Sequence, residues 1–134
     1  MSGRLAGGCL CGACRYEVED AFRYALICHC QQCRRATGAA NKPFGGIEIG
    51  RLTDLSPPGA QLIHGDPAGA HDVRCRSCGS LLWSVVREGQ WAHVAYGTLA
   101  DAPSLTPQAH IFATSKAPWE VLPEDGLPRH AAYG

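Results

Sequence analysis

The sequence predicts an all-β protein with one or two short helical turns. Its 134 residues suit a single compact domain. Its 16 glycines and 9 prolines are spread along the whole chain, where they interrupt long helices and favour short strands joined by turns. Several short runs are rich in the β-branched and aromatic residues that are typical of strands. In chain order, these runs cover residues 14–18, 24–28, 43–49, 61–64, 81–86, 91–96 and 109–113.

Helical and irregular segments fill the rest of the chain. Residues 31–37 are predicted to form a short helix that ends at Gly38, and a second helical turn is expected near residues 101–104. Residues 56–69 contain three prolines and are expected to form a loop around one strand. Further prolines exclude a terminal helix. We therefore expect residues 121–134 to form an irregular C-terminal tail packed on the same domain.

Composition narrows the class of partner. The 12 basic and 12 acidic side chains balance, so no basic surface is expected to gather phosphates, which argues against nucleic-acid binding. No apolar run approaches the roughly 18 residues of a membrane span, and the start MSGRLAGGCL lacks the apolar stretch of a signal peptide. We therefore expect a cytoplasmic protein without a membrane role, whose partners are small molecules or proteins. No pattern in the sequence specifies an oligomeric state.

Cysteine is the most informative residue type in the chain. In a reducing cytosol, eight cysteines are more consistent with metal ligation than with four disulfides, and zinc is the leading metal. They fall into three groups: Cys9, Cys11 and Cys14; Cys28, Cys30 and Cys33; and Cys75 with Cys78.

The last pair, Cys75 and Cys78, has the spacing of a zinc knuckle, a tight turn that points two sulfur atoms at one metal. A second pair from the first group would complete a closed, structural site. Cys9 with Cys11 and Cys11 with Cys14 fit equally well by spacing. Strand alternation also allows Cys14 to be a small buried thiol that binds no metal.

The middle group supplies the three sulfur atoms of Cys28, Cys30 and Cys33 within six residues. Three cysteine ligands are typical of a reactive zinc site whose fourth position is open for water or an incoming thiol. Zinc deprotonates a bound thiol yet leaves it nucleophilic at neutral pH. Arg34 and Arg35 follow directly and offer positive charge for the carboxylates of a substrate.

An alternative for the middle group is a second closed site, completed by Cys14 or His29, beside which the two arginines would simply be solvated. Strand alternation, however, predicts that His29 points away from a metal bound by its neighbours. Further along the chain, His110, Lys116 and Trp119 could build the wall of a substrate pocket. A packing role for His110 and Trp119, with Lys116 solvated, also fits the sequence.

The cysteine groups belong to a longer ordered set of motifs: GGCLCGACRYE, CHCQQCRRATGA, RCRSCGSLLW, GTLAD, AHIFATSKAPW and DGLPRH. Over roughly residues 5–130, the sequence thereby resembles the glutathione-dependent formaldehyde-activating enzyme (GFA) family, also called the centromere protein V/GFA domain. The resemblance implies a zinc-bearing β-tent fold, with a GFA-type zinc-binding domain at residues 5–120. It also implies two Zn²⁺ ions per chain: a structural zinc held by Cys9, Cys11, Cys75 and Cys78, and a reactive, more weakly held zinc on Cys28, Cys30 and Cys33, with Cys14 unligated.

The activity that the resemblance implies is that of a carbon–sulfur lyase or synthase. A small thiol such as glutathione would add to formaldehyde, or to a related small aldehyde, at the second zinc, with Arg34, Arg35 and His110 as candidate substrate-binding residues. The alternative is a non-catalytic zinc-binding module that carries a thiol adduct or binds a protein partner. The sequence departs from the family pattern at AANKPFGG and at Ala100, two places where substrate preference could be set.

Overall fold

The computed structural model describes residues 3–133 and confirms an all-β fold with one short α-helix. Its elements begin with β1 (Arg4–Gly8), β2 (Arg15–Glu19), β3 (Tyr24–Cys28), α1 (Gln31–Thr37), β4 (Lys42–Glu48), η1 (Ile49–Arg51) and β5 (Leu52–Asp54). They continue with β6 (Gln61–Gly65), β7 (His71–Cys75), β8 (Leu81–Val86), β9 (Trp91–Ala95), η2 (Tyr96–Thr98), β10 (His110–Ile111) and η3 (Ala113–Ser115). No helix among the described residues is both long and apolar enough to span a membrane.

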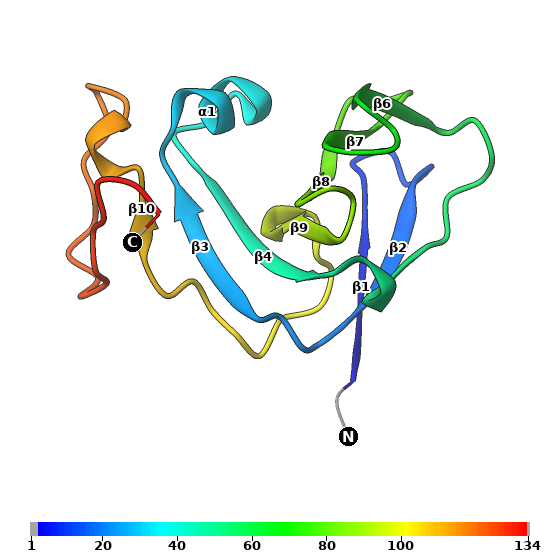
Figure 1. Cartoon of the computed structure of the whole chain (residues 1–134), viewed down its shortest axis with the longest axis horizontal. Helices are drawn as coiled ribbons and strands as arrows, with labels where there is room; N and C mark the ends of the chain where they lie inside the picture. The colour runs from blue at the N-terminus through cyan, green and yellow to red at the C-terminus, as the bar shows by residue number, and fades with distance from the viewer. Residues whose placement is uncertain (1–2, 134) are drawn as a thin grey trace.

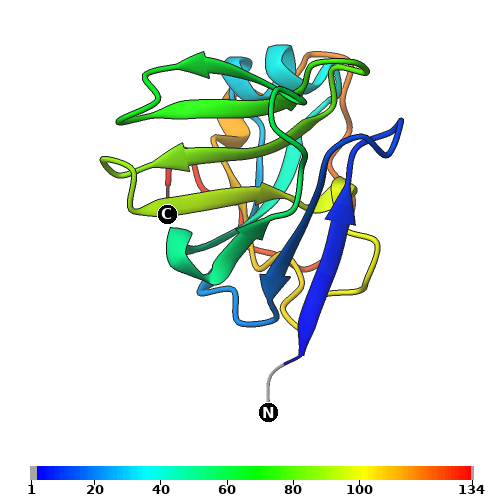
Figure 2. The ribbon, with the colours of Figure 1, turned by 90° about the vertical axis from the view of Figure 1, so that its right-hand side faces the viewer.

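The strands form two sheets that enclose the core. The larger sheet has the order β10-β3-β4-β9-β8-β7-β6, and the smaller has the order β1-β2-β5. Neighbouring strands are antiparallel except for β10 and β3, which are parallel. Figure 1 shows α1 and the strongly bent β3–β4 pair, and Figure 2 shows β1 and β2 running across the larger sheet.

The two faces of the larger sheet have different surroundings, because side chains point alternately to one face and the other along each strand. Ile47, Val85 and Val94 point into the main core, where they pack with Tyr16, Val18 and other residues of the smaller sheet. On β4, β8 and β9, the neighbouring side chains of the opposite face line a cavity instead. The same strands therefore build both the core and the floor of a pocket.

Two adjacent glycines of β4 let aromatic rings lie directly on the strand. A Cβ atom at Gly45 would stand 2.5 Å from the Tyr96 ring and 2.6 Å from the Phe22 ring. At Gly46, a Cβ atom would overlap the ring of Tyr24. Side chains are thus excluded at both positions, and the rings fill the space that they leave.

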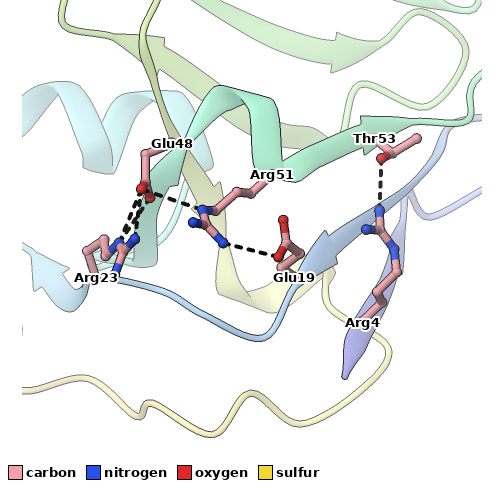
Figure 3. A network of polar contacts seen from close by, with 6 residues as sticks. All are labelled: Arg4, Glu19, Arg23, Glu48, Arg51 and Thr53. Carbon is pink, nitrogen blue, oxygen red and sulfur yellow. Dashed lines mark hydrogen bonds and ion pairs between the residues drawn. The ribbon is translucent and has the colours of Figure 1, made fainter. Parts of the chain in front are cut away.

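An ion-pair chain on the surface links the ends of strands from the two sheets (Figure 3). Arg23 donates to Glu48 at 2.9 Å, and Arg51 reaches Glu48 at 3.5 Å and Glu19, at the end of β2, at 3.1 Å. The hydrogen bond from Arg23 is the main cause that lowers the pKa of Glu48 to about 2. All four side chains are partly solvated, so each pair adds little stability, and the chain mainly fixes where the sheets meet.

Three strands lie outside the runs that were predicted from the sequence, namely β1, β5 and β7. β1 has the sequence RLAGG and no β-branched residue, and its pairing with β2 along all five residues overrides that weak local preference. β7 alternates buried Val73 and Cys75 with polar neighbours, and it joins β6 to β8 in the larger sheet.

The helical predictions were right in one place and wrong in another. α1 covers the predicted residues 31–37 and ends at Gly38, which has a left-handed φ of 68°. Residues 101–104 form bends instead of the expected helical turn, and a 3-10 turn lies earlier, at Tyr96–Thr98. The strand expected at 109–113 shortens to β10, because the chain turns into η3 directly after Phe112.

The C-terminal tail runs beside β10. The backbone N–H of His110 donates to the carbonyl of Pro128 at 2.9 Å, and His130 N–H donates to the carbonyl of His110 at 2.8 Å. One register step further, Phe112 N–H donates to the carbonyl of Ala132 at 3.1 Å. These bonds place the tail against the outer edge of the larger sheet, close to the second cysteine group.

Candidate metal centres and their pocket

The first cysteine group joins the two sheets. Cys9 and Cys11 lie in the turn that follows β1, while Cys75 ends β7 and Cys78 lies in the turn after it. The four sulfur atoms all lie within 4.8 Å of one another. Cys11 Sγ is 3.7 Å from Cys9 Sγ and 3.7 Å from Cys75 Sγ. Residues 64 positions apart in the sequence thus present their sulfur atoms to one point.

Backbone N–H groups point at these sulfur atoms. Cys78 N–H donates to Cys75 Sγ at 3.4 Å, and Cys14 N–H donates to Cys9 Sγ at 3.2 Å. The hydroxyl of Ser80 is 3.3 Å from Cys78 Sγ, and this hydrogen bond is the main cause that lowers the pKa of Cys78 to about 5. These donors favour thiolates, which is the form that binds a metal.

Cys14 is separate from this set. Its side chain is completely buried in the main core, and its Sγ donates to the carbonyl of Ala60 at 3.4 Å. The group of four that could hold an ion contains Cys9 and Cys11 but not Cys14. Of the alternatives that spacing left open, the structure therefore assembles the pair Cys9 with Cys11.

The second group lies where β3 passes into α1. Cys28 ends β3, Cys30 is the N-cap of α1, and Cys33 is in its first turn, so its N–H donates to Cys30 Sγ at 3.3 Å. The three sulfur atoms also lie within 4.8 Å of one another. The hydrogen bond from Cys33 is the main cause that lowers the pKa of Cys28 to about 6, and the same contact raises the pKa of Cys33.

His29 does not join this group. Its buried ring turns away and meets His110, with His29 Nε2 2.8 Å from His110 Nδ1, and His110 Nε2 is 2.8 Å from a carboxylate oxygen of Asp125. With both rings neutral, the carboxylate accepts from His110, which in turn accepts from His29. This chain ties the loop between Cys28 and Cys30 to the C-terminal tail.

A cavity of about 620 Å³ opens beside the second cysteine group. Cys28, Cys30 and Cys33 are part of its wall. Apolar side chains from β4, β8 and the segment around β10 cover much of the rest, among them Phe44, Leu81, Ile111 and Phe112. The volume is in the range of pockets that bind small molecules.

The polar groups of this cavity come from the sheet floor. Lys42 of β4, although only 7% exposed, donates to the hydroxyl of Ser84 on β8 at 3.2 Å. Ser84 in turn donates to the carboxylate of Asp72 on β7 at 2.6 Å. His93 of β9 stacks on Phe44 with ring centres 4.3 Å apart, and burial is the main cause that lowers the pKa of His93 to about 4.

The candidate substrate-binding residues Arg34, Arg35 and His110 are not among the residues that line this cavity. Arg34 turns toward η3 and donates to the carbonyl of Ser115 at 3.3 Å. His110 is buried, and its ring nitrogens contact His29 and Asp125. Arg35 is exposed on α1, one turn after Gln31, which does line the cavity. Lys116 donates to the carbonyl of Glu120 at 2.9 Å, and Trp119 is 70% exposed.

Lys42, Asp72, Ser84 and His93 are among the pocket residues that sequence reasoning missed. Their signal was present, since Ser84 and His93 are single polar residues inside the apolar strand runs LLWSVV and WAHVA. Ser84 and His93 are direct cross-strand partners and therefore share a face. Single polar residues within such runs mark the face that does not join the core. Lys42 lies in AANKPFGG, where the sequence departs from the family pattern.

Comparisons with known proteins show the family and the fold of the chain. The sequence profile of the family described as "Glutathione-dependent formaldehyde-activating enzyme" (GFA) matches residues 4–115. A curated Halomonas elongata protein named "Putative glutathione-dependent formaldehyde-activating enzyme" is 25% identical over 135 aligned positions, which cover 86% of this chain and 78% of that protein. A crystal structure of a Rhodobacter sphaeroides protein superposes with a TM-score of 0.59 at 23% identity, over 92% of this chain and 98% of the other, and shows a shared fold.

Proposed function

Since the chain belongs to the glutathione-dependent formaldehyde-activating enzyme family, we propose that it makes and breaks a carbon–sulfur bond between a small thiol such as glutathione and formaldehyde or a related small aldehyde. The observation that carries this proposal is the group of Cys28, Cys30 and Cys33, three sulfur atoms that converge on the wall of a cavity and leave a fourth direction free of protein ligands among the described residues. The product would be the corresponding S-hydroxymethyl thiol.

Both cysteine groups fit zinc. A tetrahedral site with Zn–S bonds of about 2.3 Å requires sulfur atoms about 3.8 Å apart, and two sulfur pairs of the first group are 3.7 Å apart. Cys9, Cys11, Cys75 and Cys78 would hold a structural zinc, because four ligands close its coordination. Cys28, Cys30 and Cys33 would hold the second, where zinc supplies a positive charge that keeps a sulfur substrate deprotonated and nucleophilic at neutral pH.

The chain's own residues would bind and orient the two substrates. Phe44, Ile111 and Phe112 line the cavity and exclude water from the reacting carbon. Gln31 offers an amide at the wall, and Arg35, exposed one helical turn beyond it, would meet a carboxylate of the thiol substrate. The hydrogen bonds between His29 and His110, and between His110 and Asp125, would hold the loop of the second cysteine group in place.

Exchange spectroscopy by NMR tests the activity directly. Glutathione and formaldehyde interconvert with S-hydroxymethylglutathione without a catalyst, and we expect the zinc-loaded protein to accelerate this exchange. The Cys33→Ser variant should lose the acceleration and one of two zinc ions per chain, while it stays folded. Cys14→Ser is the matched control and should behave as the wild type, since Cys14 lies in the core and outside both groups.

An exchange rate that stays at the uncatalysed value with two zinc ions bound would refute the proposed activity. In that case, a module that carries a thiol adduct without turning it over would be favoured. Equal acceleration by the wild type and by Cys33→Ser would place the reaction elsewhere than in the second cysteine group.

A further inference from the structure

Lys42 is a buried cation in the wall of the cavity beside the second cysteine group, and the cysteine motifs do not include it. Lysine is almost never buried unless it is paired, yet Lys42 is only 7% exposed and its polar neighbour is a neutral hydroxyl. It is the direct cross-strand partner of Cys28, and both residues line the cavity. Directly opposed residues of antiparallel strands hold their Cβ atoms about 5 Å apart.

The ammonium group of Lys42 is held in one orientation. It donates to Ser84 Oγ at 3.2 Å, and Ser84 is itself fixed by its 2.6 Å hydrogen bond to Asp72. The ring of Phe44 lies below it, with the ring centre 5.8 Å from Nζ. An ammonium group has three N–H donors, and one of them is used within the described residues. The others are available to the cavity that Lys42 lines.

We propose that Lys42 is the residue that binds the oxygen atom of the aldehyde, on the carbon that bonds to the substrate sulfur. This inference takes the thiol and the aldehyde from the proposed function and adds the group that recognises the oxygen. A substrate sulfur held beside Cys28 has that oxygen only two bonds away, inside the cavity that Cys28 and Lys42 both line. A carboxylate of glutathione is many bonds further from the sulfur and would have to fold back onto the buried floor to meet Lys42.

The chemistry balances with Lys42 as a donor. The thiol loses its proton to water, and the sulfur electron pair forms the new C–S bond while the π pair of the C=O bond moves onto oxygen. That oxygen becomes an alkoxide, whose charge is stabilised by the ammonium group. The alkoxide takes one proton from Lys42, and Lys42 regains a proton from water, so that the net reaction adds a thiol across the carbonyl. The reverse sequence releases the aldehyde.

Two measurements on the zinc-loaded protein test this role. The first is the glutathione–formaldehyde exchange rate in Lys42→Met, which keeps the length of the side chain and removes its charge. We expect kcat to fall about 100-fold, as it does when an oxyanion donor is lost, with the KM for glutathione and the zinc content unchanged. Arg4→Met removes the same charge from the surface, where Arg4 pairs with Glu17, and should leave both constants at their wild-type values.

The second measurement is binding, and it needs no turnover. S-formylglutathione carries an oxygen two bonds from sulfur, and S-ethylglutathione has carbon at that position. We expect calorimetry to show that the wild type prefers the formyl compound about tenfold, as for one hydrogen bond to a charged group. Lys42→Met should bind both compounds equally. Ser84→Ala, which retains the ammonium group but frees it, should show a reduced preference.

The outcomes separate this inference from the proposed function. Catalysis by the wild type together with full catalysis by Lys42→Met would overturn the role of Lys42 alone. A wild type that does not catalyse but prefers the formyl compound through Lys42 would overturn the proposed function alone. Loss of zinc from Lys42→Met, or from Lys42→Gln if the first variant does not fold, would show that Lys42 supports the metal group instead.

Discussion

Cys75→Ser is the substitution from which we expect the largest loss of stability. Cys75 ends β7 in the larger sheet, and its sulfur atom is 3.7 Å from that of Cys11 in the turn after β1. A zinc ion held by this group would tie the two sheets together at one edge. Structural zinc contributes roughly 10–16 kcal/mol to the folding of small domains, whereas whole proteins are stable by about 5–15 kcal/mol. Without this site, the free energy of unfolding is expected to fall to near zero or below.

Metal analysis and far-ultraviolet circular dichroism at about 25 °C would measure the loss of zinc and of folded structure. We expect Cys75→Ser to lose its structural zinc and most of its strand signal. Cys14→Ser replaces a thiol of the same neighbourhood with the same hydroxyl, but the sulfur of Cys14 belongs to the core and not to the group of four. It should keep two zinc ions and unfold near the wild-type temperature.

Two results would refute the reasoning for Cys75. A Cys75→Ser protein that unfolds at the wild-type temperature would show that the first group does not clamp the sheets. Loss of zinc from Cys14→Ser, with folding retained, would place Cys14 among the ligands and contradict the separation of Cys14 from the group.

Three further changes test other parts of the structure. Gly45→Ala should cost roughly 1–3 kcal/mol in chemical denaturation because its Cβ would stand 2.5 Å from the Tyr96 ring; an unchanged midpoint would contradict the packing. His93 has a folded-state pKa of about 4, below its ordinary value of 6.5, so the unfolded chain binds a proton first as the pH falls. The stability that His93 gives is therefore complete above pH 6.5 and is lost between pH 6.5 and 4, by up to roughly 3 kcal/mol. His93→Phe should flatten this part of the stability–pH curve, and an identical curve would argue against it. Asp125→Asn weakens the 2.8 Å contact with His110, and hydrogen exchange of the tail amides should speed up while the amides of β8 stay protected; uniform protection would contradict a local anchor.

The fold class was predictable from the sequence because the strands with strong β propensity form the middle of the larger sheet. β3, β4, β8 and β9 are rich in β-branched or aromatic residues and lie close to their predicted bounds. The missed strands depend on partners instead. β1 contains two glycines and no β-branched residue, and it is a strand because β2 supplies a complete ladder of partners. Such pairing over distance leaves no local signal in composition.

The cysteine groups were visible from spacing, but the floor of the pocket was not. Cys28, Cys30 and Cys33 are neighbours in the chain, so a single turn brings them together. Lys42 and Ser84, by contrast, meet only because β4 and β8 both pair with β9. Their hydrogen bond depends on the strand order of the sheet. As long as that order is unknown, the sequence cannot indicate which polar residues from different strands meet.

The register of β4 decides both how the core packs and which side chains line the cavity. A shift of one residue would exchange the faces of the strand, sending Phe44 into the core and Ile47 into the cavity. Gly45 and Gly46 together oppose this shift, because one direction of shift would bring Phe44 below the rings of Tyr96 and Phe22, and the other would bring Ile47 against the ring of Tyr24. The two glycines that let the aromatic rings pack therefore also keep Lys42 opposite Cys28, and a loss of register would move Lys42 out of the cavity.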